Sequence, residues 1–442
     1  MKKSVLIFFV FILIIGFGAD YLFDRAPIFT GFSAKMVASQ MFLADRTQAD
    51  IENNELHSFF LSLSKNVVDE KAKTVEGSFM GRAKQKAVYR EGLGCTLIAD
   101  GDETAVRKQK VVQKILPERP DTIAWPTGDV LPDGNSVKVD ISKLKDAIGN
   151  AFNHGNTRAV VVCYDTSFFI EKYADGFSNK TRLLGWSMSK SVTGTMIGVL
   201  VKQGRLEIDA PAPVKEWQDD NRKNITVNNL MHMTSGLEWV EDYTDISDAT
   251  IMLYEKGDMG AFALNKPAVY PPDSVWYYSS GTSNILSLII RRQFKNDQDY
   301  WKFPRETIFN KIGMRSAVFE TDASGTFVGS SYIFANARDW ARYGLLYLRN
   351  GVWNGEQILP EGWTEYTAMP APGSKDEYGA QFWLQPKELP DAPEDAYFCD
   401  GYHGQRVYII PSKKLVIVRF GLNKHGEFDY NGFVKSIIDA FD

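Results

Sequence analysis

The chain has 442 residues, of which 44% are hydrophobic and 24% are charged, and its formal net charge is −5 at pH 7. This composition is typical of a folded globular protein and excludes a disordered, collagen-like or disulfide-dense chain. The acidic balance argues against a nucleic-acid-binding protein, because such a protein carries a basic stripe.

Cysteine and histidine are scarce. The three cysteines are far apart and form no C-x-x-C pair, and no two of the five histidines stand at H-E-x-x-H spacing. Such a chain cannot build a zinc knuckle or a disulfide framework. We therefore expect neither a metal site nor a cofactor.

An apolar segment follows the first residues. Lys2 and Lys3 precede an uninterrupted apolar run from Val5 to Ala19, a pattern typical of a secretory signal peptide or a signal anchor. No A-x-A cleavage pattern follows, and a buried core helix is disfavoured because the run has no polar face. We expect residues 1–24 to remain as an inner-membrane anchor, with the rest of the chain in the periplasm or another extracytoplasmic space. This segment is the only membrane contact that we expect.

Residues 25–124 are predicted to form a small N-terminal extension without recognisable chemistry. The apolar spacing over 34–56 predicts a helix, and 74–100 predicts short strands separated by turns. The turn-rich sequence that starts at Trp125 marks a domain boundary, so residues 125–442 form the second unit.

The second unit is predicted to be an α+β domain. Two pairs of short apolar runs predict β-hairpins, one near the start of the unit and one near the end of the chain. The hairpins are predicted over 158–164 with 168–173 and over 406–410 with 415–421, and helices over 140–152, 285–292 and 337–348. We expect an antiparallel sheet built from both ends of the unit, flanked by helices and interrupted by a mostly helical insertion.

The tetrad from Ser187 to Lys190, SMSK, carries the strongest chemical signal. A strongly apolar helix follows it and is expected to end at Gly204. Ser187 and Lys190 then lie one turn apart on the same face of a buried helix. Burial can remove the proton from a lysine, and a neutral amine beside a hydroxyl is a general base for a serine nucleophile.

Two other interpretations of this tetrad were weighed. S-x-x-K alone is common and also occurs at Ser62 and Ser142, and Ser187 could be an ordinary helix N-cap with a solvated lysine. The run from Gly185 to Ser189 nearly matches the G-x-S-x-G nucleophile elbow. We reject the elbow because its last glycine is a serine and a polar segment, rather than a buried strand, precedes it.

Two later segments carry further candidates. Tyr278 precedes a polar turn and an apolar helix, and a nearby lysine ammonium is expected to lower the pKa of its phenol enough for proton transfer. Aromatic packing is the alternative role for this tyrosine. The segment CDGYHGQ, from Cys399 to Gln405, leads into a strand, and a glycine at a strand edge lets a backbone N–H approach an oxyanion.

In this order, the segments resemble the motifs of the serine β-lactamase and penicillin-binding-protein superfamily. The similarity is greatest to its class C-like branch, which includes D,D-peptidase-like esterases and 6-aminohexanoate-dimer hydrolases. A fourth segment, LMHMTSGL from Leu230 to Leu237, is similar to the L-L-x-H-T-S-G-L segment of that branch. The resemblance covers Trp125 to Asp442. It implies a β-lactamase-like fold and a serine hydrolase for a small-molecule amide or ester, and it leaves the oligomeric state open.

The resemblance also implies roles for the motif residues. Ser187 is the acylated nucleophile and Lys190 its base partner. Tyr278 is the tyrosine of the Y-x-N motif, a base or proton shuttle between nucleophile and leaving group. Ser280 stands where the family usually has the asparagine of that motif.

The remaining roles concern substrate binding. CDG, which ends at Gly401, replaces the K-T-G segment, and the oxyanion hole is expected to pair the N–H groups of Ser187 and Tyr402. His403 could contact substrate, although we favour a structural role. Tyr243 is a candidate for the loop tyrosine that closes over the substrate in 6-aminohexanoate-dimer hydrolases.

The missing lysine of K-T-G bears on function. Family members use this cation on a substrate carboxylate, so we expect weak or absent β-lactam and D,D-peptidase turnover. An exported amide or ester hydrolase is the favoured function. The alternative is a catalytically inactive, penicillin-binding-like envelope or sensor protein, which the missing lysine favours and the intact Ser187, Lys190 and Tyr278 disfavour.

Overall fold

A computed structural model describes the backbone of residues 2–153, 156–385, 387–424 and 426–441, and the side chains from Tyr21 onward. Within these described residues, no helix combines the length and the apolar character needed to cross a membrane. The apolar run from Val5 to Ala19, on which the anchor prediction depends, falls outside the described side chains.

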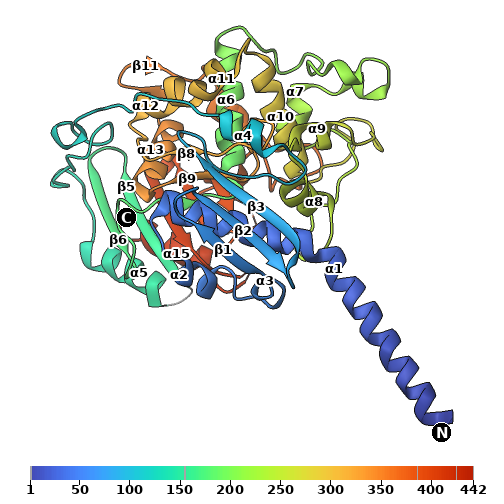
Figure 1. The fold of residues 1–442 in the computed structure, drawn as a ribbon. Helices are drawn as coiled ribbons and strands as arrows, with labels where there is room; N and C mark the ends of the chain where they lie inside the picture. The colour runs from blue at the N-terminus through green and yellow to red at the C-terminus, as the bar shows by residue number, and fades with distance from the viewer. Residues whose placement is uncertain (1, 154–155, 386, 425, 442) are drawn as a thin grey trace.

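A six-stranded antiparallel sheet forms the centre of the second unit (Figure 1). Its strands in spatial order are β12 (Trp383–Leu384), β13 (Tyr397–Gly401), β14 (Gln405–Ile410), β15 (Leu415–Gly421), β5 (Thr157–Tyr164) and β6 (Phe168–Tyr173). Both predicted hairpins are present, as β5–β6 and β14–β15. Strand β15 pairs with β5, with Val418 opposite Val161. The two ends of the unit therefore close one sheet, as predicted.

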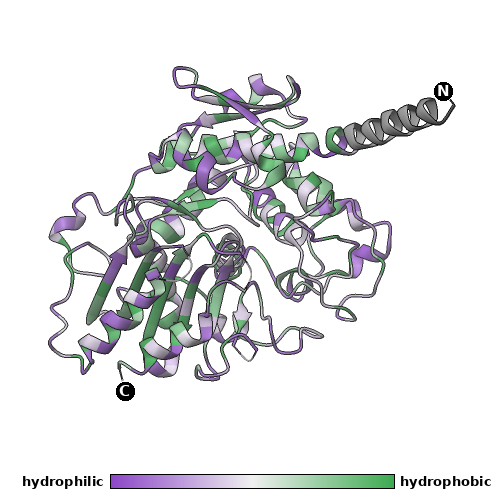
Figure 2. Cartoon of the chain, turned by 90° about the horizontal axis from the view of Figure 1, so that it is seen from below, coloured by the Kyte–Doolittle hydropathy of each residue, from purple (hydrophilic) through white to green (hydrophobic). Residues whose placement is uncertain are grey.

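Helices cover both faces of this sheet. Helices α5 (Ile141–Asn153) and α15 (Tyr430–Ile438) pack together on one face. Helix α13 (Ala337–Leu348) covers β14, β15 and β5 on the other. All seven residues of β15 are buried, as expected for a strand enclosed on both sides. Figure 2 shows the hydrophobic residues gathered on these strands and on the helix faces above them.

A long, mostly helical insertion separates β6 from β12 and contains the nucleophile helix. Its elements are β7 (Leu183–Leu184), α6 (Met188–Lys202), α7 (Val227–Met231), α8 (Asp248–Glu255), α9 (Met259–Leu264), α10 (Ser280–Arg292), α11 (Asp297–Pro304), α12 (Asn310–Ile312), β8 (Val318–Phe319), β9 (Ile333–Ala335), α13, β10 (Val352–Trp353), β11 (Glu356–Gln357) and α14 (Trp363–Thr367). Helix α6 is buried from Met188 to Leu200. It ends before Gly204, whose φ of 65° is the left-handed conformation of a helix C-terminus. The predicted α+β architecture is thus confirmed.

The N-terminal extension consists of a helix and a sheet. Its elements are α1 (Lys2–Ala44), α2 (Gln48–Asn54), α3 (Phe59–Ser62), β1 (Lys65–Asp69), β2 (Thr74–Phe79), β3 (Arg82–Arg90), β4 (Gly94–Leu97) and α4 (Glu103–Lys108). The helix predicted over 34–56 is in fact two helices, α1 and α2, because the chain leaves the helical conformation at Asp45, whose φ is 55°. Helix α1 lies between its own sheet and helix α8 of the body (Figure 1).

The extension shares its core with the second unit. Val37 and Leu97 belong to the same buried cluster as Val192 of α6. Lys35 of α1 forms a fully buried ion pair with Glu320, which also accepts a hydrogen bond from the backbone N–H of Cys95 at 2.6 Å. The N-terminal extension and the second unit therefore share a hydrophobic core and a buried ion pair.

Candidate active site

Ser187 lies at the N-terminus of α6, where a tight turn connects this helix to β7. Gly185 N–H donates to the carbonyl of Ile333 at 2.8 Å, which ties the turn to β9. Trp186 has a φ of 48°, a left-handed conformation that costs energy in a non-glycine residue and is common at functional sites. The two buried residues of β7 precede this turn, so the preceding segment is less polar than the sequence indicated. Strand β7 pairs antiparallel with β9 in a small sheet of three strands, separate from the central sheet. This arrangement differs from the central strand that precedes a nucleophile elbow.

Lys190 lies one turn along α6 and is 1% exposed. Its Nζ donates to Ser187 Oγ, to Ser280 Oγ and to the carbonyl of Ser330, each at 3.0 Å. Burial lowers the pKa of Lys190 to about 8, against the opposing effect of the nearby carboxylates of Glu241 and Asp400. A lysine with such a pKa is partly neutral near physiological pH and can accept the proton of Ser187.

Tyr278 completes the group around the nucleophile. Its phenol lies near the Ser187 hydroxyl, and Lys190 Nζ lies 4.8 Å from the centre of its ring. The expectation of a lowered phenol pKa is wrong. Burial raises the pKa of Tyr278 well above its ordinary value, and the carboxylates of Glu241 and Asp400 raise it further. Tyr278 therefore keeps its proton at neutral pH.

Ser280 connects the lysine to a carboxylate that the sequence analysis missed. Ser280 Oγ donates to Glu241 Oε1 at 2.5 Å, and Ser280 N–H donates to Glu241 Oε2 at 2.9 Å. Tyr243 O–H donates to the same carboxylate at 2.6 Å and lies 2.9 Å from Ser280 Oγ. The candidate loop tyrosine is thus held over the site by Glu241. Glu241 lies in the segment that contains Tyr243, but no motif marked it.

The hairpin between β13 and β14 brings Gly401 and Tyr402 beside the nucleophile. A Cβ atom on Gly401 would lie 2.2 Å from the carbonyl oxygen of Gly185, so only glycine allows this approach. The Tyr402 ring packs edge-on against Trp186, with centroids 5.7 Å apart. This approach suits a backbone N–H aimed at Ser187, and the assignment of Ser187 and Tyr402 as oxyanion donors stays a prediction.

The residues that replace Lys and Thr of K-T-G have structural partners. Cys399 is buried, and burial raises the pKa of its thiol to about 12, against the opposing effect of the nearby Ser191 hydroxyl. Asp400 pairs with Arg406, with Asp400 Oδ1 2.5 Å from Arg406 Nε. The position of the missing lysine is thus occupied by a buried thiol.

His403 occupies the tip of the same hairpin. Its φ is 66° and its ring lies against that of Tyr402, with centroids 3.7 Å apart. Burial lowers the pKa of His403 to about 4, assisted by the positive charge of Arg158. A neutral imidazole at a tight turn is consistent with the structural role that we favoured.

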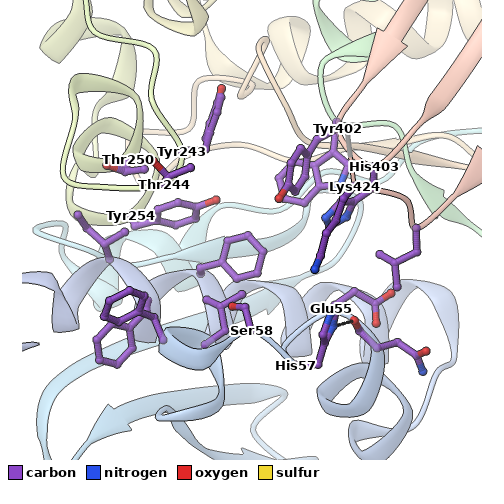
Figure 3. A pocket seen from close by; sticks show the side chains of 18 of the residues that line it. Glu55, His57, Ser58, Tyr243, Thr244, Thr250, Tyr254, Tyr402, His403 and Lys424 are labelled. Carbon is purple, nitrogen blue, oxygen red and sulfur yellow. Dashed lines mark hydrogen bonds between the residues drawn. The ribbon is translucent and has the colours of Figure 1, made fainter. Parts of the chain in front are cut away.

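Ser187 is among the residues that line a cavity of about 610 Å³. Figure 3 shows this cavity from close by. Tyr243, Thr250 and Tyr254 line one side, and Tyr402 and His403 line another. Much of the remaining wall comes from the N-terminal extension, to which the sequence assigned no role. The extension contributes Arg25, Ile28, Phe29, Phe32, Asn53, Asn54, Glu55, His57, Ser58, Phe60 and Leu61. In the described part of the chain, no three His, Cys, Asp or Glu side chains are placed to hold a metal ion.

Comparison with known proteins places this geometry in a family. The Beta-lactamase family model matches residues 156–430, which is more than half of the chain. The 6-aminohexanoate-dimer hydrolase of Paenarthrobacter ureafaciens is 25% identical over 296 residues, which cover 60% of this chain and 72% of that protein.

Solved structures show the same relationship. A protein of Bacillus anthracis assigned as a 6-aminohexanoate-dimer hydrolase superposes with a TM-score of 0.60 at 25% identity and covers 75% of this chain and 90% of its own. A family VIII carboxylesterase superposes with a TM-score of 0.55 at 17% identity, over 68% of this chain and 97% of that one. At 17% identity, the similarity to the carboxylesterase shows a shared fold and nothing more. The family match begins at residue 156, after the extension of residues 25–124. The part of the cavity wall that the extension forms is therefore not covered by this match.

Proposed function

This chain belongs to the beta-lactamase family, and we propose that it is a serine hydrolase that cleaves an amide or ester bond through an acyl-enzyme on Ser187. One observation carries the proposal: the buried amine of Lys190, with a pKa of about 8, hydrogen-bonds to Ser187 Oγ at 3.0 Å. A hydroxyl becomes an effective nucleophile when a base of suitable pKa lies within hydrogen-bond distance. The same arrangement disfavours the inactive envelope protein, since nothing in that role requires a lysine to be buried without a paired carboxylate.

Acylation then proceeds in two steps. Neutral Lys190 takes the proton from Ser187 Oγ while this oxygen attacks the substrate carbonyl and forms a tetrahedral intermediate. The N–H groups of Ser187 and Tyr402 stabilise the oxyanion. As the carbonyl re-forms, the bond to the leaving group breaks and the leaving amine or alkoxide takes a proton from Tyr278. Lys190 then gives the proton that it took from Ser187 to the Tyr278 phenolate, whose ring centre lies 4.8 Å from Lys190 Nζ.

Deacylation reverses these roles. A water molecule loses a proton to Lys190 and attacks the ester of Ser187, and Ser187 Oγ leaves with a proton returned from the lysine. The raised pKa of Tyr278 fits this scheme, because a phenol that keeps its proton can donate it to a leaving group.

The substrate class follows from the relatives and from the missing lysine. The named relative hydrolyses the 6-aminohexanoate dimer, a linear amide, and a buried cysteine occupies the position of the K-T-G lysine in this chain. We propose a linear amide or ester as substrate, with weak turnover of β-lactams.

A short nitrophenyl ester, a linear amide and nitrocefin, assayed side by side, distinguish these activities. A kcat/KM for nitrocefin near 10⁶ M⁻¹s⁻¹, inside the range of efficient enzymes, contradicts the proposed preference.

The nucleophile is tested with a fluorophosphonate probe. We expect the wild-type protein to be labelled and Ser187→Ala to remain unlabelled. Ser142→Ala is the matched control, because Ser142 belongs to another S-x-x-K tetrad on the surface helix α5. Absence of labelling in the wild type, or equal labelling of Ser187→Ala, overturns the proposal.

We also propose that residues 1–24 anchor the protein to the inner membrane, with the catalytic unit in the periplasm. The two lysines before an apolar run support this orientation. Fractionation of cells that express the full chain tests it. Recovery of the protein from the cytosolic fraction contradicts it.

A further inference from the structure

The N-terminal extension lines the catalytic cavity with polar side chains, among them Arg25 and Glu55, and with a group of apolar ones that we call the apolar wall. Helix α1 contributes Ile28, Phe29 and Phe32, and the segment around α3 contributes Phe60 and Leu61. Phe29 and Phe60 lie against each other with stacked rings whose centroids are 6.4 Å apart. All five side chains line the cavity, and Phe29, which is 4% exposed, also packs in the extension's own core against Phe79.

This wall is continuous with the nucleophile. The ring of Phe32 stacks on Trp186, the residue before Ser187, with centroids 6.1 Å apart and an interplanar angle of 17°. Phe32 also packs edge-on against Tyr254 of α8, at 5.6 Å. A group that leaves Ser187 along Trp186 therefore meets Phe32 first and the apolar wall beyond it.

An ion pair fixes the extension over the cavity. Arg25 of α1 and Asp245 of the Tyr243 loop are joined by a contact of 2.7 Å, and both residues line the cavity. The extension is thereby held to the loop that carries Tyr243. The apolar wall is a fixed part of the site.

We infer that this wall is a binding site for an apolar arm of the substrate, an alkyl or acyl chain or a flat ring attached on one side of the scissile bond. The inference rests on the proposed function, since it assigns a substrate class to the same nucleophile. A cavity of about 610 Å³ falls within the range of small-molecule sites, which are lined mainly by apolar and aromatic side chains.

The test measures chain-length preference. Two ester series are compared, 4-nitrophenyl esters of acetic to decanoic acid and acetates of ethanol to decanol, with acid release as readout. A buried methylene contributes ~0.8 kcal/mol, which corresponds to about a fourfold change in an equilibrium constant. We expect kcat/KM in one of the two series to rise by roughly tenfold or more between the two-carbon and eight-carbon members.

Phe60→Ser and Phe59→Ser form the matched pair of variants. Phe60 lines the cavity, whereas its neighbour Phe59 is 69% exposed and lies outside the lining. Phe60→Ser is expected to abolish most of the rise of kcat/KM with chain length. Phe59→Ser is expected to retain the wild-type profile.

A second variant covers the case in which Phe60→Ser fails to fold. Leu61→Trp adds volume inside the cavity and is expected to shift the preferred chain to a shorter length. The inference is overturned if neither series rises with length in the wild type, or if Phe60→Ser lowers the rates of short and long esters equally. Fluorophosphonate labelling of Ser187 in the same samples separates this failure from failure of the proposed function.

Discussion

Lys190 Nζ lies 3.0 Å from two serine hydroxyls, Ser187 Oγ at the start of α6 and Ser280 Oγ at the start of α10. The second serine stands at the position of the asparagine in the Y-x-N motif. Its Oγ donates a hydrogen bond to Glu241 Oε1 at 2.5 Å. The Ser280 hydroxyl therefore helps to position Lys190, and the negative charge of Glu241 raises the pKa of this lysine. This relationship determines how the rate should depend on pH.

The first prediction concerns the pH profile of the wild-type enzyme. Only the neutral amine of Lys190 accepts a proton, and its pKa is about 8. Below this pH the neutral fraction rises about tenfold per pH unit, because each unit below the pKa costs a factor of ten. We expect kcat/KM for an ester to rise with pH up to about 8 and then to level off. A profile that is flat between pH 6 and 9 contradicts Lys190 as the base.

Glu241→Gln tests the electrostatic origin of that profile. The negative charge of Glu241 raises the pKa of Lys190 against the effect of burial. Removing this charge should lower the pKa, so the inflection of kcat/KM should move to a pH below 8. Asp242→Asn is the control, since Asp242 belongs to the same loop but bonds to Thr244 instead. An inflection that moves upward, or moves equally in both variants, contradicts this account.

The second prediction concerns Tyr278. Loss of a positioned proton donor typically costs about 10²- to 10⁴-fold in rate. We expect Tyr278→Phe to lower kcat in this range and to retain the folded structure, because the ring still packs against Tyr378 and Trp383 at 5.8 and 5.4 Å. Esters with a better leaving group should lose less, since they need less protonation. Tyr277→Phe, at a neighbouring exposed position, should retain most of the activity. A Tyr278→Phe variant as active as wild type removes this residue from the mechanism.

The sequence was sufficient to predict contacts between residues that are close together along the chain. Ser187 and Lys190 are one helical turn apart, so their contact follows from spacing alone, and the two hairpins follow from short apolar runs around turns. Glu241 could not be found this way, because its contact with Ser280 joins a loop to a helix start thirty-nine positions away. The direction of the Tyr278 pKa shift was missed because burial, which the sequence does not display, raises this pKa, and the carboxylates of Glu241 and Asp400 raise it further.

The role of the extension was missed for a similar reason. Phe32 of the long helix α1 and Phe60 of the short helix α3 are ordinary apolar residues. Nothing in their spacing distinguishes packing against the core from lining a cavity. Only the tertiary arrangement places Phe32 on Trp186. The family motifs begin after residue 125, so they carry no information about this segment.

The third prediction tests the attachment of the extension to the body. Lys35 and Glu320 are an ion pair whose side chains are 2% and 0% exposed. Removing one partner of a buried pair leaves the other charge uncompensated and costs about 3–5 kcal/mol. We expect Lys35→Met to lower the free energy of unfolding by about this amount in chemical denaturation.

Two variants provide its controls. Lys35→Met combined with Glu320→Gln removes the stranded charge and should recover part of the lost stability. Lys84→Met breaks the exposed pair with Glu76 and should cost about 1 kcal/mol or less. A Lys35→Met variant as stable as Lys84→Met shows that the buried pair does not join the extension to the body.

The fourth prediction tests the approach of the β13–β14 hairpin to the nucleophile. A Cβ atom at position 401 would lie 2.2 Å from the carbonyl oxygen of Gly185, a backbone atom that cannot move aside cheaply. Gly401→Ala should therefore push the hairpin away from Ser187 and withdraw the N–H of Tyr402 from the oxyanion. Loss of one such donor costs about 10²- to 10³-fold in kcat. Gly149→Ala in α5, where the added carbon meets only the end of Lys172 at 4.0 Å, should leave kcat unchanged. If Gly401→Ala retains its kcat and only its melting temperature falls, the hairpin supports the fold and another group stabilises the oxyanion.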